Sequence, residues 1–134
     1  MGLAERRATA EFQAAVFPGL KNQIDQAAGF DVPIEIDWAS LAQPNDAHIY
    51  NEYWTQIYFE PLIRAFRQVC ADDMGKDALK SGLKKIEITN SGEKYDRRAF
   101  SFEDGVLKID HKLTNVDHLD ERTEKVVSLL EEGL

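Results

Sequence analysis

The stretch Tyr50–Val69, YNEYWTQIYFEPLIRAFRQV, has the composition of one long helix, yet it carries Pro61 in its middle. It also holds six of the thirteen aromatic residues of the chain. On an ideal helix, at about 100° per residue, its apolar residues before Pro61 point to one side and those after it to nearly the opposite side. One straight helix cannot bury both sides against a single sheet, so the fold depends on what happens around Pro61.

Three arrangements satisfy this pattern. In the first, a kink or break at Pro61 re-aims the second half so that both apolar sides reach one core, because proline removes a backbone donor and commonly kinks helices. In the second, the first half presents Tyr50, Tyr53 and Trp54 to another protein or subunit, since aromatic residues with polar tips are enriched at interfaces. In the third, the same rings line a small-molecule pocket between this helix and the sheet.

Four short segments alternate apolar and polar residues, as half-buried strands do. The first is VPIEIDW at residues 32–38, and the other three, KKIEITN, DRRAFSF and VLKIDHKL, follow one another between residues 84 and 113. The connections SGEK and EDG are short and contain glycine, which is typical of hairpins. We therefore predict that the last three strands form an antiparallel meander.

Helical periodicity also covers residues 3–28, with an interruption at Pro18, and residues 115–134, where Asp117 is positioned to cap the helix. The resulting order, α-β-α-β-β-β-α, predicts a single α+β domain over residues 1–134. We expect a largely antiparallel four-stranded sheet, made of the N-terminal strand and the three-strand meander, with helices packed on one face. Strands of an all-parallel sheet covered on both faces would be continuously apolar, and these are not.

The charge and cysteine content narrow the class of protein. Sixteen basic and 24 acidic residues give a formal charge of −8, which repels phosphate backbones and anionic membranes, so we expect no nucleic-acid and no membrane partner. Basic clusters at residues 80–85 and 94–98 are interleaved with acids and indicate a solvated sheet face. The single cysteine, Cys70, excludes an internal disulfide, and no apolar run resembles a secretory signal or a membrane span. These features predict a cytoplasmic location.

Two pairs of residues are candidates for chemistry on helices and strands. His48 and Glu52 share a helix face, but a metal site needs at least a third ligand. Glu35 and Asp37 project to the same side of the first strand, where we expect them to form its wet face. Cationic residues that could pair with these carboxylates across the sheet are Lys84, Lys85, Arg97 and Arg98.

A third group lies between the last strand and the last helix. Asp110 and His111 are neighbours on a strand and therefore point to opposite faces. Asp117 and His118 occupy the start of a helix, where a cap and a first-turn residue are needed. Because no nucleophile or substrate signature flanks these residues, we expect them to have structural roles.

We therefore predict a non-enzymatic, cytoplasmic interaction or regulatory domain, which uses the aromatic helix surface Tyr50–Tyr58 for self-association as a homodimer or for binding another protein. Toxin-inhibiting immunity proteins offer an analogy, in charge and size only, for an acidic chain that neutralises a basic partner. The alternative is a small-molecule-binding or catalytic α+β domain with a pocket between that helix and the sheet. We expect no cofactor and no metal. Residues that would form the interface or the pocket are Tyr50, Tyr53, Trp54, Tyr58, Arg64 and His48.

Overall fold

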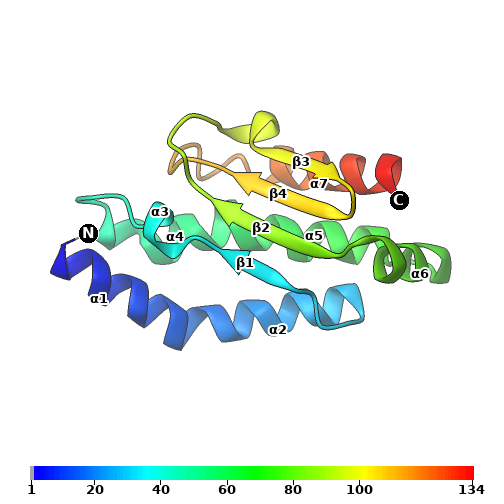
Figure 1. The fold of residues 1–134 in the computed structure, drawn as a ribbon, viewed down its shortest axis with the longest axis horizontal. Helices are drawn as coiled ribbons and strands as arrows, with labels where there is room; N and C mark the ends of the chain where they lie inside the picture. The colour runs from blue at the N-terminus through cyan, green and yellow to red at the C-terminus, as the bar shows by residue number, and fades with distance from the viewer. Residues whose placement is uncertain (1) are drawn as a thin grey trace.

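A four-stranded sheet forms one layer of the protein and helices form the other (Figure 1). The computed structural model describes residues 2–134. The strands lie in the spatial order β1-β2-β4-β3. Their bounds are β1 (Ile34–Ile36), β2 (Lys85–Thr89), β3 (Phe100–Glu103) and β4 (Val106–Asp110).

The sheet is mixed, so the prediction of a largely antiparallel sheet is wrong. β1 pairs with β2 and β2 pairs with β4 in parallel, and only β3 and β4 are antiparallel. The predicted EDG hairpin is present between β3 and β4, with Asp104 at φ 53° and Gly105 at φ 79°, as a tight two-residue hairpin turn requires.

The last three strands do not form a meander, because β4 lies between β2 and β3. After β2 the chain crosses to the far edge of the sheet through residues 90–95 and the 3₁₀ helix η4 (Asp96–Ala99), and only then returns as β4. The SGEK connection therefore joins strands that are not neighbours. Alternation of side chains reports which face of a strand is buried and says nothing about the direction of its partner.

Helices are found in all three predicted regions, and two shorter helices, α3 and α6, add to them. In the N-terminal and central regions the α-helical segments are joined by π-helical turns, η1 and η3. The bounds are α1 (Leu3–Glu11), η1 (Phe12–Val16), α2 (Phe17–Ala28), α3 (Trp38–Leu41), the 3₁₀ helix η2 (Ala47–Ile49), α4 (Tyr50–Trp54), η3 (Thr55–Phe59), α5 (Glu60–Val69), α6 (Asp73–Gly82) and α7 (Leu119–Gly133).

Both prolines within helices follow a π-helical turn at the same spacing. Pro18 follows η1 and Pro61 follows η3, and in each case the residue just before the proline donates its N–H to the first residue of the turn. The wider turn relieves the clash between the proline ring and the carbonyl four residues earlier. It also inserts one residue, which rotates the apolar side by about 100° relative to an uninterrupted α-helix.

This rotation allows both halves of the aromatic helix to face one core. Trp54 before the turn and Phe66 after it are both fully buried. The Trp54 ring stacks on Tyr50 with centroids 4.2 Å apart and meets Phe12 edge-on at 5.1 Å. The first of the three arrangements is therefore the observed one, with a π-turn rather than a break at Pro61.

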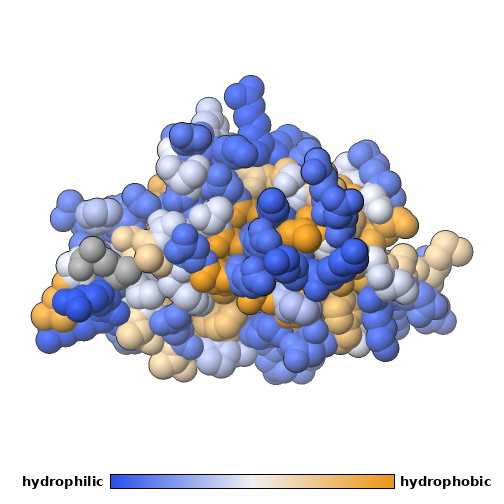
Figure 2. Space-filling model, in the orientation of Figure 1, coloured by the Kyte–Doolittle hydropathy of each residue, from blue (hydrophilic) through white to orange (hydrophobic). Residues whose placement is uncertain are grey.

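Helices cover only one face of the sheet (Figure 1), with α5 lying between α2 and α7. Buried strand residues such as Ile86, Ile88 and Leu107 point toward these helices. We call the other face, which points away from the helices, the open face. Figure 2 views the protein from this side and shows hydrophilic residues interleaved with hydrophobic ones. Polar strand residues of the open face are Glu35, Lys85, Glu87, Thr89, Ser101, Glu103, Lys108 and Asp110.

Candidate functional site

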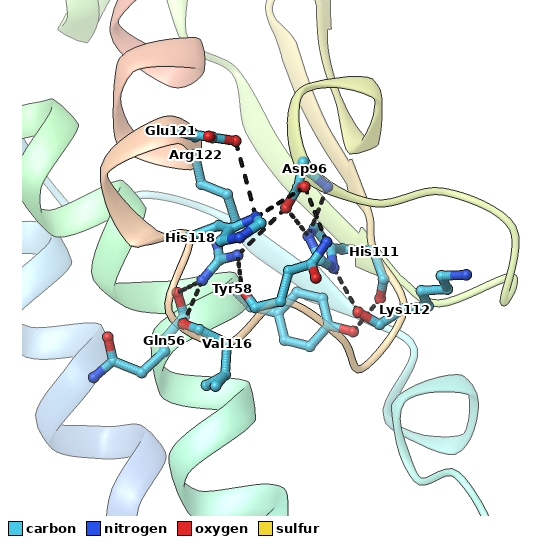
Figure 3. Close-up of polar contacts among 10 residues, drawn as sticks. Gln56, Tyr58, Asp96, His111, Lys112, Val116, His118, Glu121 and Arg122 are labelled. Atoms are coloured by element: carbon cyan, nitrogen blue, oxygen red, sulfur yellow. Dashed lines mark hydrogen bonds and ion pairs between the residues drawn. The ribbon is translucent and has the colours of Figure 1, made fainter.

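A cluster of polar side chains lies where the loop after β2, the end of β4 and the start of α7 converge (Figure 3). Its central members are Asp96, His111, His118 and Arg122. Asp96 adopts a left-handed backbone conformation, with φ 52°, which is uncommon for a residue other than glycine. The cluster joins residues from three separate segments, so we first ask whether its atoms are free for chemistry.

Arg122 is fully buried and uses its guanidinium to hold backbone carbonyls. It donates to the carbonyls of Asn115, Val116 and Gln56 at 2.7, 2.9 and 3.1 Å, and it lies 3.8 Å from the Asp96 carboxylate. Burial lowers the pKa of Arg122, but a guanidinium stays protonated in proteins. The side chain therefore ties α7 to the Gln56 carbonyl near the start of η3 and to the loop before α7.

His111 is also fully buried, and both of its ring nitrogens are occupied. Nε2 accepts from the Asp96 N–H at 2.9 Å, so the proton resides on Nδ1, which donates to the Lys112 carbonyl at 2.5 Å. Burial lowers the pKa of His111 to about 4, and the nearby Arg122 cation adds to this effect. The hydroxyl of Tyr58 donates to the His111 carbonyl from the helix side. His111 is thus a neutral structural group with no atom left for a substrate.

His118 is the accessible member of the cluster. Its Nδ1 lies 3.1 Å from Oδ2 of Asp96 and 3.9 Å from Glu121. The hydrogen bond to Asp96 raises the pKa of His118, which favours the imidazolium form. The Asp96–His118 pair resembles the orienting half of an acid–base site, but among residues 2–134 no serine, threonine or cysteine side chain is hydrogen-bonded to His118.

Asp96, His118 and Glu121 also place three metal-ligand atoms within 4.8 Å of one another. Oδ2 of Asp96 already accepts from Asn115 at 3.0 Å and from His118, and the Arg122 cation lies close to Oδ1. A buried cation at this distance opposes binding of a second one. These contacts therefore fit a structural role, in which the cluster holds the loop against α7, better than a metal site.

The sequence analysis grouped two members of this cluster, His111 and His118, but did not identify Asp96 or Arg122 as their partners. His111 and His118 do meet around Asp96, whereas Asp110 accepts from the backbone and hydroxyl of Ser91 at 2.7 and 2.8 Å. The prediction that Asp117 caps the last helix is wrong, because His118 occupies the N-cap position of α7 without a side-chain cap bond. No spacing or motif in the sequence links residues 96 and 122.

The structure separates the six residues predicted for the aromatic surface or pocket. Tyr50, Trp54 and Tyr58 are buried in the core, where the Tyr50 hydroxyl donates to the Gln43 carbonyl at 2.7 Å. Burial raises the pKa of Tyr50 to about 12. Tyr53 is half-buried, and His48 and Arg64 are exposed. Arg64 pairs with Glu60 at 3.4 Å and with Asp120 at 3.6 Å.

A different candidate lies on the open face. A hollow of about 270 Å³, which we call the basic hollow, lies over β2, β4, β3 and η4. Three cations, Lys94, Arg98 and Lys108, border it. The other residues lining it are Glu87, Thr89, Ala99, Phe100, Ser101 and Asp110.

The two carboxylates at the basic hollow are engaged by other groups. Asp110 is bonded to Ser91, and Glu87 lies 3.1 Å from Lys85. Lys85 also reaches Glu35 at 3.3 Å, so the predicted pairing across the first two strands is confirmed for this cation. Within residues 2–134, none of the three bordering cations makes an ion pair, whereas neighbouring Arg97 turns to α7 and pairs with Glu124 at 3.1 Å.

No family model, no curated protein and no solved structure matches the chain. Within residues 2–134, no helix combines the length and the apolar character needed to cross a membrane.

Proposed function

We propose that the protein is a non-enzymatic binding domain and that the open face of its sheet is the binding surface. The observation that carries this proposal is the uncovered face itself: all-parallel sheets almost always have helices on both faces, and in this mixed sheet two of the three pairings are parallel with helices on one face only. A face that all-parallel sheets cover with a second helical layer is left accessible here.

Hollows on the open face support the same surface. Besides the basic hollow, two others of about 360 and 350 Å³ lie over β1–β2 and over the start of β2 with the β3–β4 hairpin. Glu87 borders all three. The three hollows therefore adjoin one another at Glu87 on the open face.

The lining of this face defines the chemistry of what it binds. Glu35 and Glu87 lie on β1 and β2, and Lys108 is the register partner of Glu87 on β4. Charges of both signs with few exposed apolar side chains favour a polar, charge-bearing ligand over an apolar helix or peptide. The formal charge of −8 disfavours a nucleic acid as that ligand.

In this proposal the open face takes the place of the aromatic helix surface, Tyr50–Tyr58, as the binding surface. An interface built on Tyr50–Tyr58 would have to rely on Tyr53, because the other rings lie in the core. The polar cluster around Arg122 stabilises the fold and leaves the open face as the binding surface, since its buried groups hold backbone carbonyls. We also propose a cytoplasmic location, which a single, free and buried cysteine, Cys70, suits.

Amide chemical-shift mapping tests the proposal with three probes of different chemistry: inorganic phosphate, spermine and the apolar dye ANS. We expect phosphate or spermine at millimolar concentration to shift amides of the open face, on β1, β2, β3 and β4, and to leave α2 and α6 unchanged. ANS should not shift the open face. Absence of any open-face response to both polar probes, or a response confined to the helical layer, would overturn the proposal.

A further inference from the structure

We propose that the basic hollow binds the phosphate group of a small phosphorylated molecule. This inference rests on the proposed function, because it assigns a ligand class to one part of the open face. It depends on three observations: the cations that border the hollow, the engagement of its carboxylates elsewhere, and its size.

The donors around the basic hollow come from separate elements and face one space. Lys94 belongs to the loop after β2, Arg98 to η4 and Lys108 to β4. Ser101 on β3 is the register partner of Lys108, so its hydroxyl lies beside the lysine on the same face. An arginine fork, two ammonium groups and a hydroxyl form the donor set that phosphate oxygens accept from.

The acids at the hollow offset only part of the charge of these donors. Both Asp110 oxygens accept from Ser91, and Glu87 is held by Lys85, whose pKa is raised by its hydrogen bonds to Glu87 and Glu35. Asp110 keeps its negative charge, so this carboxylate and the three cations, unpaired among residues 2–134, leave a net charge of about +2 at the hollow. That charge matches a phosphate monoester, which carries about −1.5 to −2 at neutral pH, better than a single carboxylate.

Size and lining restrict the rest of the ligand. At about 270 Å³ the hollow is slightly smaller than typical ligand sites, which span ~300–1,000 Å³. The one aromatic residue that lines it, Phe100, is buried beneath the strand, so the hollow offers no exposed ring for a nucleobase to stack on. The ligand that fits is therefore a phosphorylated compound without a base, or phosphate itself.

The test is a titration of wild type and variants with inorganic phosphate and with glycerol phosphate, followed by the amide shifts of Thr89, Ser101 and Lys108 at constant ionic strength. We expect saturable shifts at these amides, with tighter binding of the monoester if the ligand is a phosphorylated molecule. Arg98→Ala and Lys108→Ala should each weaken binding about tenfold, the value expected for one charge-assisted hydrogen bond.

Arg97→Ala is the matched control, because it removes the same charge from the adjacent residue, whose side chain pairs with Glu124 away from the hollow. It should leave phosphate binding within about twofold of wild type, since only the diffuse field changes. Arg98→Lys should recover part of the affinity, because the charge remains and the fork is lost. Circular dichroism of each variant verifies that it is folded.

Three results would overturn the inference: equal losses in Arg97→Ala and Arg98→Ala, acetate binding as tightly as phosphate, or no saturable shift around the hollow. The response to spermine separates this failure from failure of the proposed function. If spermine still shifts the open face while phosphate does not, the open face remains the binding surface and only the assignment to phosphate falls. If neither shifts it, both proposals fall.

Discussion

Truncation of Trp54 to alanine is expected to destabilise the fold by about 3–5 kcal/mol, which is the range for removing a fully buried large aromatic side chain. The Trp54 side chain is 0% exposed and packs against Tyr50, Phe12 and, at 5.7 Å between centroids, Trp38. Stacked and edge-on ring pairs each contribute about 0.5–1.5 kcal/mol beyond area burial, so the loss should fall in the upper part of this range.

A second substitution separates packing from polarity at the same position. The indole Nε1 of Trp54 is buried and has no hydrogen-bond partner among residues 2–134, a state that costs about 1–3 kcal/mol. Trp54→Phe removes this orphaned donor while keeping one ring of the pair with Tyr50. The gain offsets part of the cavity cost, and we expect a net loss well below that of Trp54→Ala.

Urea unfolding followed by circular dichroism measures both losses, and size-exclusion chromatography with light scattering measures the mass of each protein. The reasoning requires a large loss of stability in Trp54→Ala with no change in mass relative to wild type. A loss below about 1 kcal/mol together with a lower oligomeric mass would refute it, because the ring would then belong to an interface between subunits.

Three further predictions concern the buried polar cluster and the π-turn. Arg122→Met should cost about 3 kcal/mol or more in urea unfolding, because three backbone carbonyls lose a charged donor, and Arg122→Lys should recover only part of it. Burial lowers the pKa of His111 from 6.5 to about 4, so the fold should lose about 3 kcal/mol of stability as pH falls from about 6.5 to about 4. This stability is fully present above pH 6.5. A flat stability profile that His111→Gln leaves unchanged would contradict this prediction. Pro61→Ala should change the free energy of unfolding by less than about 1 kcal/mol, because the buried rings of Tyr58 and Phe59 hold the π-turn η3 in place. Slower amide exchange across residues 55–61 in this variant would indicate a regular α-helix and would contradict the prediction that the π-turn persists without the proline.

The pH dependence of the cluster has two opposing parts. His118 has its pKa raised by Asp96, so its contribution is present below its unfolded pKa and is lost as pH rises through the higher folded value. The His111 contribution has the opposite sign and lies at lower pH. A stability profile with a shallow fall on the alkaline side, removed by His118→Gln, would be the signature of the exposed histidine.

Local patterns predicted the elements of this fold but not their pairing. Glu87 and Lys85 alternate with Ile86 and Ile88 because β2 is covered on one face only, and this alternation is the same for parallel and antiparallel partners. Glycine-containing loops were interpreted as hairpins, which holds for Gly105 and fails for the SGEK segment, where the chain crosses to the far edge of the sheet.

The aromatic helix illustrates a second limit. An ideal helical projection assumes a constant 100° per residue, and the π-turn Thr55–Phe59 breaks that assumption by one residue. Pro61 indicated where the ideal helical projection would fail, but it did not predict that a π-turn would be the cause. Residues of the basic hollow were visible in the sequence as part of the cluster at 94–98, but only the fold shows that Arg97 turns toward α7 while Arg98 borders the hollow.

The central claim, that the open face of the sheet is the binding surface, is tested most directly by mapping amide shifts of the wild-type protein with phosphate and spermine. The account predicts saturable shifts on the exposed side of β2 and β4, around Glu87 and Lys108, with α2 and α6 unchanged. Shifts confined to the helical layer near Tyr53, or no saturable shift on the sheet with either probe, would contradict it.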